Sequence, residues 1–118
     1  MTDSGRHRTQ ATTLQSLAAG VTPGEVAYHE FLRVPDMSLG FYTLPAGSTD
    51  PQHPHGEDEV YHVIAGKGIL RVEGEDIPVA PGSIVYVPKL AAHRFHSITA
   101  DLHVLVYFAP AEGSPDDR

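Results

Sequence analysis

Four residues in two separate segments have the types and spacing of a metal-binding site. His53 and His55 lie two positions apart, Glu59 follows four positions later, and His93 comes from a distant segment. Side chains two positions apart on an extended strand project from the same face, so the two histidines can present nitrogen atoms to one point. Either histidine alone would more simply be an exposed loop residue. The combination with Glu59 and His93 predicts a shell of three imidazoles and one carboxylate.

This donor set suits a divalent transition metal: iron, manganese, nickel, copper or zinc. Octahedral coordination would leave two positions open for a substrate or water. The ion could then polarise a chelating substrate, lower the pKa of a bound water or, with a redox metal, take part in dioxygen chemistry. The chain has no cysteine, which excludes thiolate ligands and disulfides.

Side chains alternate between the two faces of a strand, and this alternation (the parity of a position) separates the other candidate residues into pocket-facing and outward-facing ones. Tyr61 and Phe95 share the parity of Glu59 and His93, so they are predicted to line a pocket beside the metal, with ordinary core packing as the alternative. The opposite parity predicts structural or surface roles for His62 and His96.

Short strands are the elements expected to position these side chains. Proline and glycine divide the chain into short segments rich in apolar, β-branched and aromatic residues, a pattern typical of an all-β sandwich or barrel. The predicted strands are residues 30–34, 39–44, 60–64, 68–72, 84–87, 93–98 and 102–108. Only residues 13–19 suggest a helical turn. We expect one domain over residues 14–110, with polar, mobile tails at 1–13 and 111–118.

The two ligand-bearing segments resemble the two sequence motifs of the cupin superfamily. The first motif is matched at every fixed position, by Gly47, His53, His55, Glu59 and Gly66. The second is matched by Gly82, Pro88 and His93.

Two residues depart from the second motif. Leu90 stands where the family has glycine, and it predicts a turn that avoids a positive φ angle. Ser97 stands where the family has asparagine, so the turn hydrogen bond expected of that asparagine is in question. Neither departure removes a proposed metal ligand.

The resemblance covers residues 28 to 110 and implies a single jelly-roll barrel of about six to eight strands with one metal in its lumen, often in a homodimer. It does not imply one reaction, since the family includes dioxygenases, isomerases, lyases, sugar-binding regulators and storage proteins. Two functions therefore remain open. One is a metal-dependent enzyme, oxidoreductases included, acting on a small oxygen-rich chelating substrate. The other is a non-catalytic cupin that binds a sugar-like ligand. A purely structural metal is a further alternative.

Charge and composition exclude other classes of partner. The formal net charge of −7 and the pI near 5.5 disfavour binding to nucleic acid. No apolar run approaches the roughly 20 residues needed to span a membrane. The first residues are polar and lack the apolar stretch of a secretory signal, so a cytoplasmic location is expected.

Overall fold

A computed structural model describes residues 8–113 of the chain. The outer parts of both predicted tails, residues 1–7 and 114–118, lie outside the described residues. Residues 8–13 are exposed, whereas Ala111 is buried. The mobility of the two tails stays a prediction.

One short helix and six strands make up the described chain. The helix α1 spans Leu14–Ala19 and is capped by Thr13, whose hydroxyl accepts a hydrogen bond of 3.0 Å from the Ser16 amide. The predicted helical turn is thus confirmed. The strands are β1 (Ala27–Val34), β2 (Met37–Leu44), β3 (Asp58–Val72), β4 (Glu75–Val79), β5 (Ile84–Val87) and β6 (His93–Ala109).

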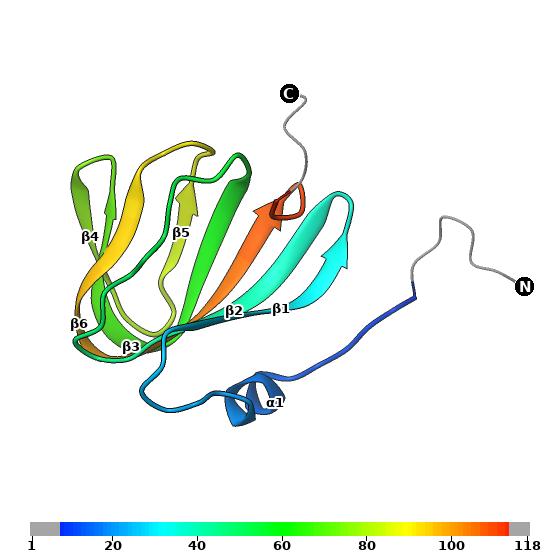
Figure 1. The fold of residues 1–118 in the computed structure, drawn as a ribbon, viewed down its shortest axis with the longest axis horizontal. Helices are drawn as coiled ribbons and strands as arrows, with labels where there is room; N and C mark the ends of the chain where they lie inside the picture. Colours follow the sequence, from blue (N-terminus) through cyan, green and yellow to red (C-terminus); the bar gives the residue numbers. More distant parts are fainter. Residues whose placement is uncertain (1–7, 114–118) are drawn as a thin grey trace, which may run out of the picture.

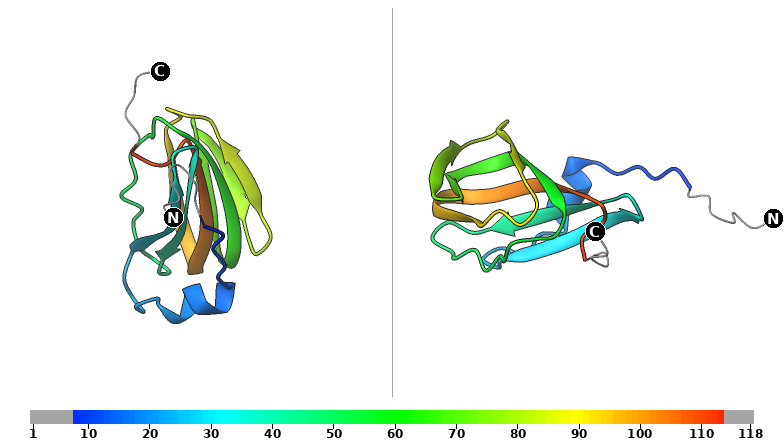
Figure 2. Two further views of the ribbon diagram at one scale, coloured as in Figure 1. Left: turned by 90° about the vertical axis from the view of Figure 1, so that its right-hand side faces the viewer. Right: turned by 90° about the horizontal axis from the view of Figure 1, so that it is seen from above.

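The strands form one sheet that folds back on itself around the core. Its order is β1-β2-β6-β3-β4, with β5 also paired to β3, and every pairing is antiparallel. The first part of β3 pairs with β5 and its last part with β4, so β3 and β6 run through both ends of the barrel. Figures 1 and 2 show the resulting curved arrangement of strands. The all-β jelly-roll prediction is confirmed.

Two strands are longer than the sequence suggested. Residues 60–64 and 68–72 belong to one strand, β3, because its pairing with β6 shifts register around Gly66 instead of ending there. Gly66 has a φ of +94°, and a β-carbon there would lie 2.1 Å from the carbonyl oxygen of Asp101. Glycine therefore lets the bent strand pass close to its neighbour. Residues 93–98 and 102–108 similarly belong to one strand, β6. Strand β4 was not predicted, because its acidic residues and Pro78 are typical of a turn or sheet edge.

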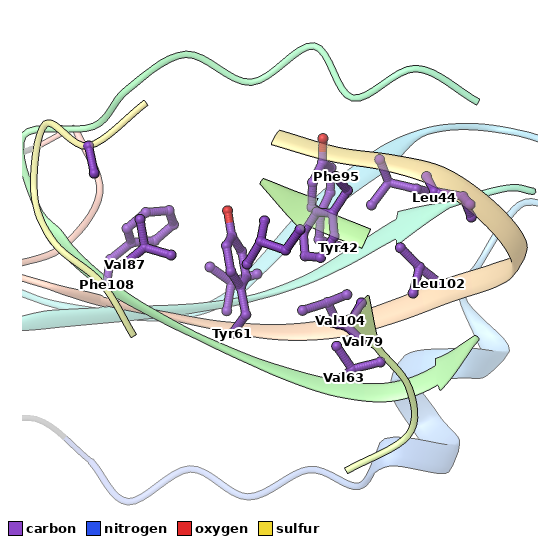
Figure 3. Packing of buried hydrophobic residues seen from close by; sticks show 14 residues of the cluster. Tyr42, Leu44, Tyr61, Val63, Val79, Val87, Phe95, Leu102, Val104 and Phe108 are labelled. Atoms are coloured by element: carbon purple, nitrogen blue, oxygen red, sulfur yellow. The ribbon is translucent and has the colours of Figure 1, made fainter. Parts of the chain in front are cut away.

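The core lies between the facing parts of the sheet. Alternate residues of β3 and β6 are buried, including Tyr61, Val63, Val104 and Val106. Figure 3 shows the buried side chains converging between the strands. This alternation places the side chains of Glu59 and His93 on the inner face, at the starts of β3 and β6. No helix within residues 8–113 is long and apolar enough to cross a membrane.

Candidate metal centre

Three of the four predicted ligands meet inside the barrel. Ligand atoms of His55, Glu59 and His93 all lie within 4.8 Å of one another. Glu59 and His93 are buried, with 2% and 7% of their surfaces exposed, whereas His55 is half-buried in the loop before β3. One side of this group therefore opens toward the mouth of the barrel.

The atoms that meet in this group are electron-pair donors, which accept hydrogen bonds or bind a cation. His93 Nδ1 donates to the Ala91 carbonyl at 2.8 Å, which leaves the Nε2 lone pair facing Glu59 Oε1 at 3.3 Å when the imidazole is neutral. Both carboxylate oxygens of Glu59 are buried, and no residue in the described chain donates a hydrogen bond to them. Such acceptors are costly to bury without a cation between them. The donor set of two imidazoles and one carboxylate therefore fits a divalent transition metal.

The surroundings of His93 shift its pKa in opposite directions. Burial lowers the pKa of His93, but its contacts with the Glu59 carboxylate and the Ala91 carbonyl outweigh that effect and raise the pKa above its usual value. The raised pKa thus follows from the close contact with the Glu59 carboxylate.

The turn before β6 helps to hold His55. The Leu90 amide donates to the His55 carbonyl at 2.6 Å, and the Ala91 amide donates to the Pro88 carbonyl at 3.1 Å. Leu90 adopts a φ of +66°, so the prediction that this turn avoids a positive φ is wrong. These two hydrogen bonds accompany a left-handed backbone that leucine does not favour. Ser97 also has a positive φ, of +50°, and its hydroxyl lies 2.9 Å from His96 Nδ1.

His53 is not part of the three-residue group. Its side chain is exposed and lines a second surface cavity, which also includes His93, Arg71 and Arg94. The loop is not a regular strand here, so alternation of side chains does not carry across Pro54. A ligand role for His53 remains a prediction.

Gln52, which the sequence did not single out, points to the centre instead. Its side-chain Oε1 lies 3.2 Å from His93 Nε2 and accepts a hydrogen bond of 2.7 Å from the Tyr61 hydroxyl. Its amide nitrogen donates to Asp50 at 2.6 Å, which fixes the orientation of the amide. Gln52 thus presents one more oxygen atom to the centre.

Asp50 anchors this arrangement from the core. It is 1% exposed, and its carboxylate accepts hydrogen bonds from the Tyr42 hydroxyl at 2.5 Å and the Phe95 amide at 2.9 Å, as well as from the backbone and side chain of Gln52. These donors satisfy the hydrogen-bonding capacity of the buried carboxylate. No motif in the sequence marked Asp50, and only its neighbours in space show its role.

A cavity of about 290 Å³ adjoins the centre. Its lining includes His55 and Glu59 of the cluster, and Tyr61 as predicted from parity. Phe95 is not among the lining residues. It is buried behind Tyr61, with ring centroids 5.0 Å apart. Burial, together with the Glu59 charge, holds the pKa of Tyr61 well above its usual value, so the phenol is a neutral group.

The fold is that of a cupin. The Cupin domain family matches residues 40–108, and the chain belongs to this family. An uncharacterised protein of Streptomyces coelicolor is 48% identical over 103 residues, covering 87% of this chain and 98% of the relative. The solved structure of TT1209 from Thermus thermophilus has a TM-score of 0.76 and 28% identity, covering 87% of this chain and 99% of that one. Acireductone dioxygenase of Bacillus cereus is 37% identical over 49 residues, which are 37% of this chain and 29% of the dioxygenase.

Proposed function

We propose that this protein is a metal-dependent enzyme acting on a small, oxygen-rich molecule that chelates the metal. The observation that carries the proposal is the buried carboxylate of Glu59, which receives no hydrogen bond within the described chain and is grouped with His55 and His93 beside a cavity. A purely structural metal would usually be enclosed by protein ligands, whereas this group opens onto space of ligand size.

His55, Glu59 and His93 would hold the ion, and His53 is proposed as a fourth ligand through a rotation of its exposed loop side chain. The ion, when bound, would supply Lewis-acid catalysis or, if it is redox-active, dioxygen chemistry. Tyr61 shapes the pocket beside it, and Phe95 supports the Tyr61 ring from behind. The partial match to acireductone dioxygenase supports a reaction of the dioxygenase type, with isomerase and lyase types as alternatives.

Elemental analysis of untagged protein, purified without added metal, tests the proposal. We expect about one iron, manganese, nickel, copper or zinc ion per chain, and none in a His55→Ala/His93→Ala variant. His62→Ala is a matched control because its side chain lies on the opposite face of β3 from Glu59. Protein that is metal-free and cannot be reconstituted would contradict the proposal.

Two further measurements refine it. If His53→Ala binds the metal as tightly as wild type, His53 is not a ligand. Turnover assays with sugar acids, diketones and flavonols separate an enzyme from a binding protein, because a binding protein would give saturable binding without product.

We also propose a homodimer, as the family resemblance implies. Ile84, Tyr86 and Leu90 are large apolar or aromatic residues with 69%, 59% and 68% of their surfaces exposed, and burying them would favour association. Light scattering tests this, and a monomer at high protein concentration would contradict it.

A further inference from the structure

The cavity beside the metal centre has aromatic walls on the side away from His93. Tyr28 lies against Tyr42 and Phe108, with ring centroids 5.9 and 6.3 Å apart and interplanar angles of 70° and 72°. All three rings line the cavity. Gly40 makes room for this arrangement, since a β-carbon there would lie 2.0 Å from Cζ of Tyr28.

The wall offers ring surfaces more than hydrogen-bonding groups. The hydroxyl of Tyr42 already donates to Asp50, and the hydroxyl of Tyr61 already donates to Gln52. Val26, Ala27 and Val106 add apolar surface beside the rings, where the Tyr28 hydroxyl and the Glu112 carboxylate are the polar groups. A polyhydroxylated group such as a sugar would find few partners here, because its hydroxyls would lose hydrogen bonds to water without replacement.

The wall is also negatively charged. Glu112 lines the cavity with its side chain 32% exposed, and its carboxylate lies 3.8 Å from His55 Nδ1. No lysine or arginine is among the lining residues within 8–113. The nearby Arg33 is outside the lining, where it pairs with Glu30 at 3.0 Å and donates to the Glu112 carbonyl.

Glu112 lines the same cavity as Tyr28, Tyr42 and Phe108. A cation placed between this carboxylate and the rings would be stabilised by both.

Aromatic faces combined with a carboxylate favour one chemical class of ligand. A quaternary ammonium or similar alkylated cation has no N–H to donate, is weakly hydrated, and is attracted to the faces of aromatic rings. A carboxylate or phosphate group at the same place would be repelled by Glu112 and find no cationic partner.

We propose that this cavity binds a small ligand with an alkylated cationic head group, such as a quaternary ammonium, seated among Tyr28, Tyr42, Phe108 and Glu112. The opposite, oxygen-bearing end of the ligand would face His55 and Glu59. Only the placement of that second end rests on the proposed function. The cation site depends on the aromatic and acidic wall alone.

The first test compares choline with 3,3-dimethyl-1-butanol, its uncharged counterpart of the same shape, by isothermal titration calorimetry on the full-length protein. We expect choline to bind about tenfold more tightly, both before and after treatment with a chelator. Equal binding of the two compounds, or no binding of choline, would overturn the inference.

Variants then test whether the preference for choline over its uncharged counterpart comes from the aromatic and acidic residues that line the cavity. Glu112→Gln and Tyr28→Leu should each lower the ratio of the two affinities by about threefold or more, whereas Tyr28→Phe keeps the ring and should preserve it. Glu75→Gln removes an exposed carboxylate on the distant β4 and is the matched control. If Glu112 acted only through His55, its replacement would change both affinities equally and leave the ratio unchanged, which contradicts the inference.

A second pair of ligands separates this inference from the proposed function. Glycine betaine and 3,3-dimethylbutyrate share a carboxylate and differ in the charge of the head group. If the metal is a chelation site, it should strengthen the binding of both acids, and the charged acid should still bind about tenfold more tightly. A preference for the cation without any effect of metal would contradict the proposed function alone. An effect of metal without a preference would contradict the cation site alone.

Discussion

Replacing Glu59 with glutamine should stabilise the metal-free protein while removing its stabilisation by metal ions. The carboxylate is 2% exposed, neither of its oxygens receives a hydrogen bond within the described chain, and His93 Nε2 faces Oε1 at 3.3 Å. An amide in the same position has no charge to desolvate, and its NH2 group can donate toward that nitrogen.

The size of the effect follows from the cost of a buried group without partners, about 1–3 kcal/mol. We expect Glu59→Gln to raise the free energy of unfolding of chelator-treated protein by ~2 kcal/mol at a pH above the raised pKa of His93, where the imidazole is neutral. For a domain of this size, that corresponds to a rise in Tm of roughly 8 °C. Saturating metal at about 1,000 times its Kd should stabilise wild type by ~4 kcal/mol and leave the variant unchanged, so the order of stability reverses.

Asp50→Asn is the matched control, because it makes the same chemical change at another buried carboxylate. Asp50 accepts hydrogen bonds from Tyr42, Gln52 and Phe95, and an amide cannot accept them all. We expect a loss of ~2–3 kcal/mol, opposite in sign to the effect at Glu59. Urea denaturation with and without chelator measures both variants. A Glu59→Gln protein that is no more stable than chelated wild type, or that metal still stabilises, would refute this account of the centre.

Three further predictions concern the backbone and the surface. Leu90→Gly should stabilise the protein by ~0.5 kcal/mol in urea denaturation, because the left-handed strain is relieved at an exposed position, whereas Leu90→Ala should give no gain. Gly66→Ala should cost more than about 3 kcal/mol or prevent folding, because the new β-carbon would collide with a neighbouring carbonyl. Gly47→Ala, at φ +78° with no atom within 4 Å, should cost only ~1 kcal/mol, and equal losses at the two glycines would contradict the packing argument. The pKa of Asp76 is held below its usual value, chiefly by its hydrogen bond with His96. The contact therefore stabilises the fold fully above the ordinary carboxyl pKa, and this stabilisation is lost as the pH falls through the lowered pKa. Titration followed by NMR should show the Asp76 pKa rising toward its usual value in His96→Gln, and an unchanged pKa would exclude this cause.

Local sequence patterns predicted much of the fold. Alternating apolar residues between proline and glycine turns predicted the all-β class, and the strand predicted at residues 84–87 agrees with β5 at Ile84–Val87. The same parity predicted that Tyr61 would share the inner face with Glu59, because strand geometry repeats every two residues. Patterns failed where a strand bends without ending. Gly66 has the sequence signature of a turn, and only its pairing partners across the sheet show a bulge.

The candidate metal centre was likewise predictable from the sequence only in part. The sequence by itself determined the types and spacing of the candidate ligands, and the structure brings His55, Glu59 and His93 together. The tertiary structure alone decided which loop residue faces the barrel, because residues 50–56 lie outside any strand and their side chains are directed by contacts with Asp50 and Tyr61. It also decided the positive φ of Leu90, which accompanies a hydrogen bond to a loop more than thirty residues earlier in the chain. Strand periodicity is a local property that can be counted along a sequence, whereas the direction of a loop side chain depends on partners that only folding brings near.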